Sequence, residues 1–253
     1  MSDIEIIYNP NKSAMKIAVL VSGTGTNFLA IYDEQLRLEK LGEKNYGKIE
    51  VVFTNVPNCE GARKAADLGI PVVSLGSKSF FEILNANPEN DEIRAYYDAA
   101  TISLIEGVCK PDIVVLAGYR RRIGGLFLNH YKNRVVNLYP GDITKRYLIR
   151  GVDASIQALR AGEAYTKCTV FLENPGERFG PSIVQSQPIS LEGYEERDAT
   201  KMQEKIRREG EWIIYPFAVH QLIAKGRLGI DRNDNIYVDG KRVPKEGYQY
   251  KVN

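Results

Sequence analysis

The chain alternates between short apolar runs and longer segments in which apolar positions recur with a helical period. Continuous apolar runs such as residues 113–116 are typical of strands covered on both faces. Strands that alternate with helices predict a parallel sheet with right-handed crossovers and helices on both faces. The expected strands are 16–22, 50–54, 71–74, 112–116 and 135–139, and the expected helices are 28–41, 60–68, 91–108 and 125–131.

The pattern changes in the last part of the chain, where strand-like segments are followed by one long helical segment. A turn rich in proline and glycine separates the two strand-like segments, and Asp239-Gly240 is a typical hairpin turn. We therefore expect an α/β, Rossmann-like open sheet with a long C-terminal helix and a small hairpin. The later elements are expected at 166–173 and 182–190 for the strands, 199–224 for a helix interrupted at Gly210, and 227–243 for the hairpin.

Length and composition are those of an ordinary globular chain: 253 residues, 43% hydrophobic and 26% charged. We expect a loose N-terminal extension at residues 1–15 and a single domain at 16–253. The net charge of +2 gives no argument for a nucleic-acid or membrane partner, and no apolar run approaches the roughly 18 residues of a spanning helix. The composition leaves a homodimer open.

The three cysteines, Cys59, Cys109 and Cys168, form neither a metal motif nor a disulfide framework. No metal is therefore expected. Asp3 and Glu5 stand near the first residue, and no apolar segment of the kind found in signal peptides follows them. A reducing cytoplasm is the expected location.

The segment at residues 16–27, KIAVLVSGTGTN, joins a buried strand to a glycine loop and a helix start. Backbone N–H groups at a helix start point at an anion, and glycines let the backbone approach it. The loop is neither the Gly-x-Gly-x-x-Gly pattern nor the lysine-bearing P-loop, so a small phosphorylated ligand is the favoured interpretation. An ordinary tight turn without a ligand is the alternative.

Two further expected strands end in polar or glycine-containing segments, at residues 117–122 and 137–142. Ligands of open parallel sheets bind beyond the carboxyl ends of the strands. We therefore expect these two segments and the glycine loop to converge on one side of the sheet.

These segments resemble the glycinamide ribonucleotide formyltransferase family, whose members transfer a formyl group from 10-formyltetrahydrofolate to an amine. The resemblance runs from about Met15 to Tyr248 and includes KIAVLVSGTGTN, PDIVVLAGY, NHYKNRVVNLYP and EWIIYPFAVHQLIAKGRL. It implies the formyltransferase fold, 10-formyltetrahydrofolate as donor and a small phosphorylated acceptor, by default glycinamide ribonucleotide in purine biosynthesis.

The resemblance also implies roles for individual residues. Asn137 matches the catalytic asparagine, whose amide would donate to the formyl oxygen as negative charge develops there. The implied binding residues are Gly23, Thr24, Gly25, Thr26 and Asn27 for the phosphate, Arg94 as a further phosphate contact, Glu211 for the ribose, and Tyr119, Arg120, Arg121, Arg122 and Ile123 for the donor pocket.

The implied donor pocket carries more charge than its family counterpart. Arg121 occupies the position of the family arginine, whereas Arg120 and Arg122 replace apolar residues. Burying three unpaired guanidiniums in an apolar pocket is costly. One interpretation is that one or two of them reach solvent or pair with acids such as Glu177, and the other is a more anionic donor or a different placement of the folate tail.

The catalytic positions depart from the family pattern. Tyr139 stands where the family carries a histidine, and a phenol that titrates near 10 is a poor base at neutral pH. Tyr139 could still help Asn137 to hold an oxyanion. The family aspartate before a Gly-Pro pair aligns with Arg178, and a shift of one residue would let Glu177 supply the carboxylate.

Asp142 and Asp153 are further candidates for that carboxylate, although capping or turn roles would explain both. His130 and His220 fall on helical patterns and are expected to be structural. The leading hypothesis is formyl transfer to a phosphorylated amine. The altered catalytic residues leave two alternatives: an enzyme with a different acceptor, and a catalytically impaired nucleotide-binding or regulatory protein.

Overall fold

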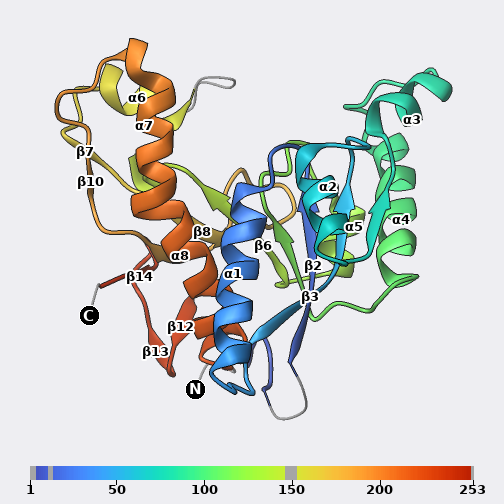
Figure 1. Ribbon diagram of the computed structural model, residues 1–253, viewed down its shortest axis with the longest axis horizontal. Coiled ribbons are helices and arrows are strands. Elements are labelled where there is room, and N and C mark those ends of the chain that lie inside the picture. Colours follow the sequence, from blue (N-terminus) through green and yellow to red (C-terminus); the bar gives the residue numbers. More distant parts are fainter. Residues whose placement is uncertain (1–3, 11–13, 146–152, 252–253) are drawn as a thin grey trace.

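The computed structural model describes residues 4–10, 14–145 and 153–251. Its centre is an eight-stranded sheet, seen nearly edge-on in Figure 1. In spatial order the strands are β14 (Tyr248–Gln249), β9 (Ser182–Gln185), β8 (Thr169–Leu172), β6 (Val135–Tyr139), β5 (Ile113–Leu116), β2 (Met15–Val21), β3 (Gly47–Thr54) and β4 (Val72–Ser74).

Five neighbouring strands of this sheet, from β6 to β4, run parallel. Strand β8 runs antiparallel to both β6 and β9, and β14 is parallel to β9. The predicted mostly parallel sheet is therefore confirmed. The reversal at β8 places a strand from the later part of the chain directly beside β6.

Helices cover both faces of the sheet, because successive side chains of each buried strand point to opposite faces. Val19 and Leu20 of β2 belong to separate apolar clusters. Helices α1, α7 and α8 pack on one face, and α3, α4 and α5 pack on the other. The helices are α1 (Thr26–Lys40), α2 (Glu60–Asp67), α3 (Ser77–Ile83), α4 (Asp91–Glu106), α5 (Gly125–His130), α6 (Ala154–Arg160), α7 (Ala199–Ile206) and α8 (Trp212–Pro216), with short 3₁₀ turns η1 (Ile143–Lys145) and η2 (Glu196–Asp198).

The predicted long C-terminal helix is present but widens instead of breaking at Gly210. Helices α7 and α8 are joined by the π turn η3 (Arg207–Glu211), and a second π turn, η4 (Phe217–Ile223), follows. A Cβ on Gly210 would lie 2.5 Å from the sulfur of Cys168, so glycine allows the helix to pass close to the chain before β8. Such wide turns change the direction of the side chains that follow them.

The N-terminal residues form part of a second sheet. Strand β1 (Glu5–Ile6) pairs antiparallel with β11 (Leu228–Ile230), so the expectation of a loose extension is wrong for this segment. The predicted hairpin is confirmed by β12 (Ile236–Val238) and β13 (Lys241–Arg242), which complete this sheet. The two strand-like segments around the Pro/Gly-rich turn also pair at their outer ends, as β7 (Tyr165–Thr166) and β10 (Ile189–Ser190).

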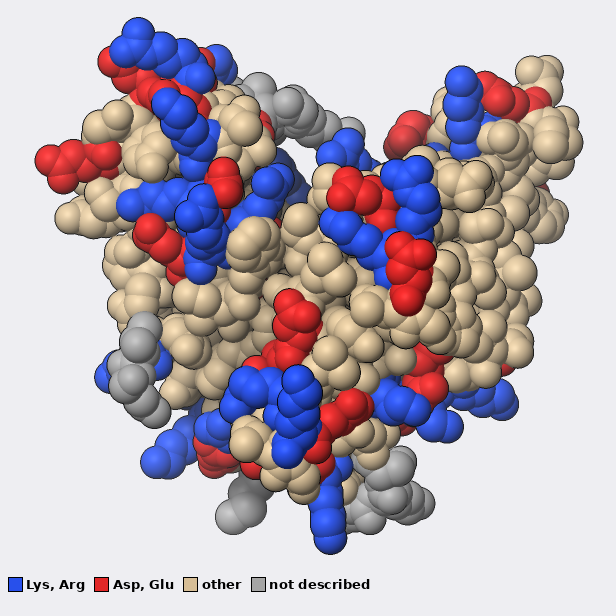
Figure 2. Space-filling model, viewed as in Figure 1, with Lys and Arg blue, Asp and Glu red and all other residues tan. Residues whose placement is uncertain are grey.

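Charges of both signs are interspersed over the face shown in Figure 2. Many are neighbours on one helix, as in the pairs Lys64–Glu60 and Lys205–Glu209. This face therefore presents no extended field of one sign, and the charges inside individual cavities decide what binds there. Within the part of the chain that the structure describes, no helix is long and apolar enough to span a membrane.

Candidate active site

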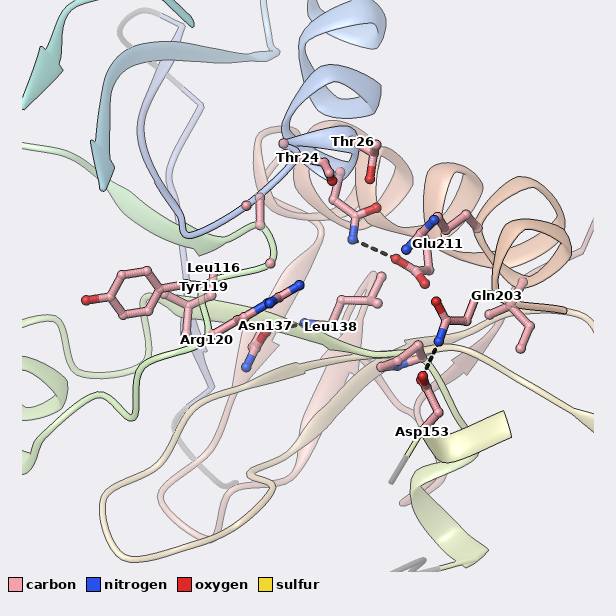
Figure 3. Close-up of a pocket in the computed structure, with 18 of the residues that line it drawn as sticks. Thr24, Thr26, Leu116, Tyr119, Arg120, Asn137, Leu138, Asp153, Gln203 and Glu211 are labelled. Atoms are coloured by element: carbon pink, nitrogen blue, oxygen red, sulfur yellow. Dashed lines mark hydrogen bonds between the residues drawn. The ribbon is translucent and has the colours of Figure 1, made fainter. Parts of the chain in front are cut away.

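The three predicted strand ends meet in one cavity of about 460 Å³ at the carboxyl edge of the parallel strands (Figure 3). The predicted convergence is therefore confirmed. Segments from α6, α7 and η3 close the cavity on the side away from β5. The lining residues include Gly23, Thr24, Gly25, Thr26, Asn27, Leu116, Tyr119, Arg120, Asn137, Leu138, Asp153, Gln203, Arg207 and Glu211.

The glycine loop ends at a helix start that no side chain caps. Gly25 is the N-cap of α1, with φ of 72°, and no side chain accepts from the first N–H groups of the helix. These groups and the helix dipole favour an anion at this point. The structure thus provides the geometry that the sequence predicted for a phosphate.

Close backbone packing holds the loop in place. A Cβ on Gly25 would lie 2.6 Å from the Cα of Gly61, and the N–H of Gly61 donates to the carbonyl of Gly23 at 2.8 Å. The ammonium of Lys64 donates to the carbonyl of Thr24 at 3.0 Å. Helix α2 therefore fixes the loop through contacts that only glycines at positions 25 and 61 permit.

We expect Gly61→Ala to weaken anion binding and to destabilise the fold. Its Cβ would lie 3.0–3.2 Å from three backbone atoms of the loop. Such overpacking costs about 1–3 kcal/mol, more than the gain of at most about 1 kcal/mol from replacing glycine in a helix. Thermal unfolding and phosphate titration measure both effects. Gly125→Ala is the control, because its Cβ would meet no atom within 4 Å, and an equal loss there would contradict the prediction.

Asn27 and Glu211 connect the loop to the C-terminal helix. The side-chain Nδ2 of Asn27 donates to Glu211 Oε2 at 2.7 Å, and the side-chain oxygen Oδ1 of Asn27 has no partner in the described part of the chain. Glu211 lies in the π turn η3 and is 8% exposed. Burial raises the pKa of its carboxyl, while the bond from Asn27 lowers it. The carboxyl predicted to bind a ribose therefore lies beside the predicted phosphate site.

Arg120 lies in this cavity and not in a separate donor pocket. Its backbone N–H donates to Ser22 Oγ at 2.8 Å, and the Ser22 hydroxyl donates to Asn55 Oδ1 at 2.5 Å. Arg120 Nη2 is 3.9 Å from the position that a Cβ on Gly23 would take. Figure 3 shows the side chain directed into the space between Asn137 and the glycine loop.

Asn137 is held in one orientation by its neighbours. Its side-chain oxygen accepts from the N–H of Leu138 at 2.7 Å, and its Nδ2 donates to Glu173 Oε1 at 2.6 Å. These two bonds fix which end of the amide is the donor and leave one N–H of Nδ2 without a described acceptor. The amide can therefore donate to a ligand atom in the cavity.

Glu173 is a residue that the sequence interpretation missed. It follows β8, and its N–H donates to the carbonyl of Val135 in β6 at 2.9 Å, which brings its side chain to Asn137. Burial raises the pKa of the Glu173 carboxyl, and the hydrogen bond from Asn137 partly offsets this rise. The sequence held one signal, because the carboxyl of Glu173 ends an apolar run. It did not show that β6 would be the neighbouring strand.

The structure does not place Tyr139 and Glu177 in the cavity. The Tyr139 ring packs on Phe179, with centroids 4.8 Å apart, and its hydroxyl has no partner within the described ranges. Burial raises the pKa of Tyr139, so the phenolate that could accept a proton is even less populated at neutral pH. Glu177 and Arg178 are exposed and line a different cavity. The structure thus does not bring Glu177 to Asn137, and the replacement of the family aspartate by Glu177 stays a prediction.

The predicted donor segment does not form one pocket. Tyr119 lines the same cavity as Arg120. Arg121 lies over the ring of Phe81 at 4.1 Å, and Arg122 is exposed, with Glu89 at 3.9 Å. The sequence left two interpretations of the three arginines. The first, that some of them reach solvent or pair with an acid, is confirmed for Arg122. Ile123 packs against the apolar cluster under α4 and α5.

Arg94 is separated from the glycine loop and belongs to another site. Its buried guanidinium bonds to Asp91 Oδ1 at 2.7 Å, to Glu89 Oε2 at 3.2 Å and to the carbonyl of Pro88 at 2.9 Å. Arg94 lines a cavity between α4 and α5 that does not include the loop. The phosphate contact stays a prediction, although Arg94 is paired with these carboxylates and lines a different cavity from the loop.

The two remaining candidate acids, Asp142 and Asp153, take different roles. Asp142 accepts from Thr144 and Gln185, as expected for a turn residue. Asp153 instead lines the cavity and accepts from Gln203.

His130 is exposed and bonds to Glu106 at 2.7 Å, whereas His220 is fully buried under α1. Both histidines have structural contacts, as predicted. Among the described residues, no group of three or more His, Cys, Asp and Glu could hold a metal ion.

Comparison with known proteins identifies the family. A family model described as formyl transferase matches residues 15–219. The phosphoribosylglycinamide formyltransferase of Escherichia coli K12 is 30% identical over 92% of this chain and 98% of its own length.

Solved structures agree with this assignment. The phosphoribosylglycinamide formyltransferase of Coxiella burnetii superposes with a TM-score of 0.72 at 25% identity, over 94% of this chain and all of that chain. Glycinamide ribonucleotide transformylase 1 of Symbiobacterium toebii superposes with a TM-score of 0.66 at 29% identity, over 89% of this chain and 94% of that chain. The chain belongs to the formyl transferase family and has the formyltransferase fold.

Proposed function

We propose that this protein transfers a formyl group to the amine of a phosphorylated acceptor, with glycinamide ribonucleotide as the default acceptor and 10-formyltetrahydrofolate as the donor. One observation carries the proposal: an uncapped helix start and the amide of Asn137 line the same cavity. The relatives, which are phosphoribosylglycinamide formyltransferases, support this acceptor and this reaction. The cytoplasm as location and a homodimer as assembly remain predictions.

The acceptor would bind with its phosphate on the N–H groups of residues 23–26, where the helix dipole favours negative charge. Glu211 would accept from a ribose hydroxyl, because one of its carboxyl oxygens is not used by Asn27. These two contacts would direct the amine towards Asn137, at the opposite wall of the cavity (Figure 3).

Asn137 would act on the formyl oxygen. The amine nitrogen would attack the formyl carbon, so that a C–N bond forms and the carbonyl π electrons move to the oxygen. Loss of the donor nitrogen from that carbon, with the amine proton passing to the donor nitrogen, would complete the transfer. The free N–H of Asn137 would donate to this oxygen, and the bonds to Leu138 and Glu173 would hold the amide in place. An amide held in this way needs no reorientation as the charge develops.

The residues predicted to hold the donor do not share a cavity, so they do not fit a folate ring as a group. Tyr119 and Arg120 line the acceptor cavity, whereas Arg121 covers Phe81 and Arg122 reaches solvent. We therefore assign no residue to the donor ring and no step of the reaction to it.

We expect the wild-type protein to form formylated glycinamide ribonucleotide more slowly than the Escherichia coli relative. Tyr139 replaces the histidine that the family resemblance implies, and its hydroxyl is buried. Loss of general acid–base help slows a reaction by about 10²–10⁴-fold. Parallel assays of both enzymes with 10-formyltetrahydrofolate measure this ratio.

Other outcomes of this assay separate the alternatives. Acceptor binding without any transfer would support a nucleotide-binding protein that has lost catalysis. Transfer to a different phosphorylated amine alone would support a changed acceptor. The absence of both acceptor binding and formyl transfer would refute the proposed function.

A further inference from the structure

Arg120 brings a guanidinium into the cavity at a position where the family pattern has an apolar residue. Its backbone N–H is fixed on Ser22, and its Nη2 lies beside Gly23. In Figure 3 the side chain runs from the turn after β5 towards the glycine loop. The backbone of Arg120 is therefore held in place, and its exposed guanidinium reaches the cavity beside the glycine loop.

The carboxyls of the cavity do not neutralise this charge. Glu211 accepts from the amide of Asn27 and has Arg207 as its charged neighbour, and Asp153 accepts from the amide of Gln203, so none of these contacts involves Arg120. Within the described ranges Arg120 makes no ion pair, and burial further disfavours the charged form of Glu211. The cavity thus keeps a positive charge next to an uncapped helix start.

Arg121 and Arg122, which follow Arg120 in the sequence, cannot take the same role. Arg121 stacks on Phe81, and its Nη2 reaches the carbonyl of Pro88 at 3.5 Å. Arg122 is 62% exposed and lies near Glu89. Of these three arginines, only Arg120 lines the cavity with the glycine loop.

We propose that Arg120 is a specificity-determining residue whose guanidinium contacts the phosphate of the acceptor, so that the site selects a phosphate dianion over an uncharged analogue. This inference rests on the proposed function, in which residues 23–26 bind that phosphate. The planar guanidinium fork matches the spacing of phosphate oxygens. Each charge-assisted hydrogen bond therefore strengthens binding of the dianion more than binding of a neutral hydroxyl.

Ribose 5-phosphate and ribose are the probes for this proposal, used with the full chain in calorimetric titration. Arg120→Met should weaken binding of ribose 5-phosphate by about 10–100-fold and leave the weak binding of ribose unchanged. Arg120→Lys should fall between wild type and Arg120→Met, because lysine keeps the charge but loses the fork. Arg122→Ile is the matched control in the same turn and should leave the affinity unchanged.

The possible outcomes distinguish this inference from the proposed function. Unchanged affinity of Arg120→Met for ribose 5-phosphate would overturn the inference, and continued formyl transfer would leave the proposed function standing. Equal losses in Arg120→Met and Arg122→Ile would also overturn it, since a general charge effect would explain both. Failure of the wild type to bind ribose 5-phosphate would overturn the inference, and only the absence of formyl transfer as well would refute the proposed function.

Discussion

Asn137→Ala is expected to lower kcat for formyl transfer by about 10²–10³-fold with little change in the KM of the acceptor. The reason is that the free N–H of Asn137 would act on the formyl oxygen, while the loop and Glu211 hold the acceptor. An interaction that strengthens only as charge develops affects the rate and not the binding. Single-turnover transfer and titration with ribose 5-phosphate measure the two quantities separately.

Variants of Glu173 provide the matched control. Glu173→Gln keeps an acceptor for Asn137 Nδ2 and should retain most of the activity. Glu173→Ala frees the amide to rotate and should lower kcat to a value between those of wild type and Asn137→Ala. Wild-type kcat in Asn137→Ala would exclude the oxyanion role. A parallel loss of ribose 5-phosphate affinity would show that Asn137 acts in binding instead.

The central sheet could be predicted from the sequence because its strands are buried on both faces. Apolar runs such as β5 (Ile113–Leu116) have no alternating pattern, and turns rich in glycine and polar residues bound them. Helix α3 was missed because seven residues, with Phe80 and Phe81 adjacent, are too few to show a helical period. The order of strands beyond β6 depends on contacts between distant segments, which no local pattern encodes.

The same difference between local motifs and contacts of distant segments explains which residues of the candidate site could be predicted. The glycine loop, Asn137 and Glu211 could be predicted because each belongs to a local motif that carries its own geometry. The contact of Glu173 with Asn137 could not, since it requires the antiparallel pairing of β8 with β6. The directions of the three arginines were equally hidden, because Arg121 is drawn away by Phe81 of the unpredicted helix α3.

Acid is expected to destabilise the protein through His220, by about 3 kcal/mol between pH 6.5 and pH 4. His220 is fully buried, and its Nδ1 accepts from the N–H of Gly47 at 3.1 Å, so Nε2 carries the proton and donates to the carbonyl of Ile31 at 3.0 Å. Burial lowers the pKa of His220 to about 4. The charged neighbours on α1 are Glu34, which opposes this shift, and Arg37, which adds to it.

The direction of this change in stability follows from the number of protons that the folded and unfolded states bind. Between pH 6.5 and pH 4 the unfolded chain binds a proton at this histidine while the folded protein does not, so the free energy of unfolding falls as the pH falls. Buried carboxyls with a raised pKa, such as Glu173 and Glu211, act in the opposite direction over part of this range. Variants must therefore be compared with wild type at each pH.

Urea unfolding at pH 7, 5 and 4 measures the effect. His220→Gln should be less stable than wild type at pH 7, because it disturbs the bonds to Gly47 and Ile31, but it should lose less stability on acidification. His130→Gln should change the dependence on pH much less than His220→Gln, since His130 lies at the surface. If His220→Gln lost as much stability as wild type between pH 7 and pH 4, another group would have to cause the acid sensitivity. The buried imidazole would then be only a packing element that joins β3 to the C-terminal helix.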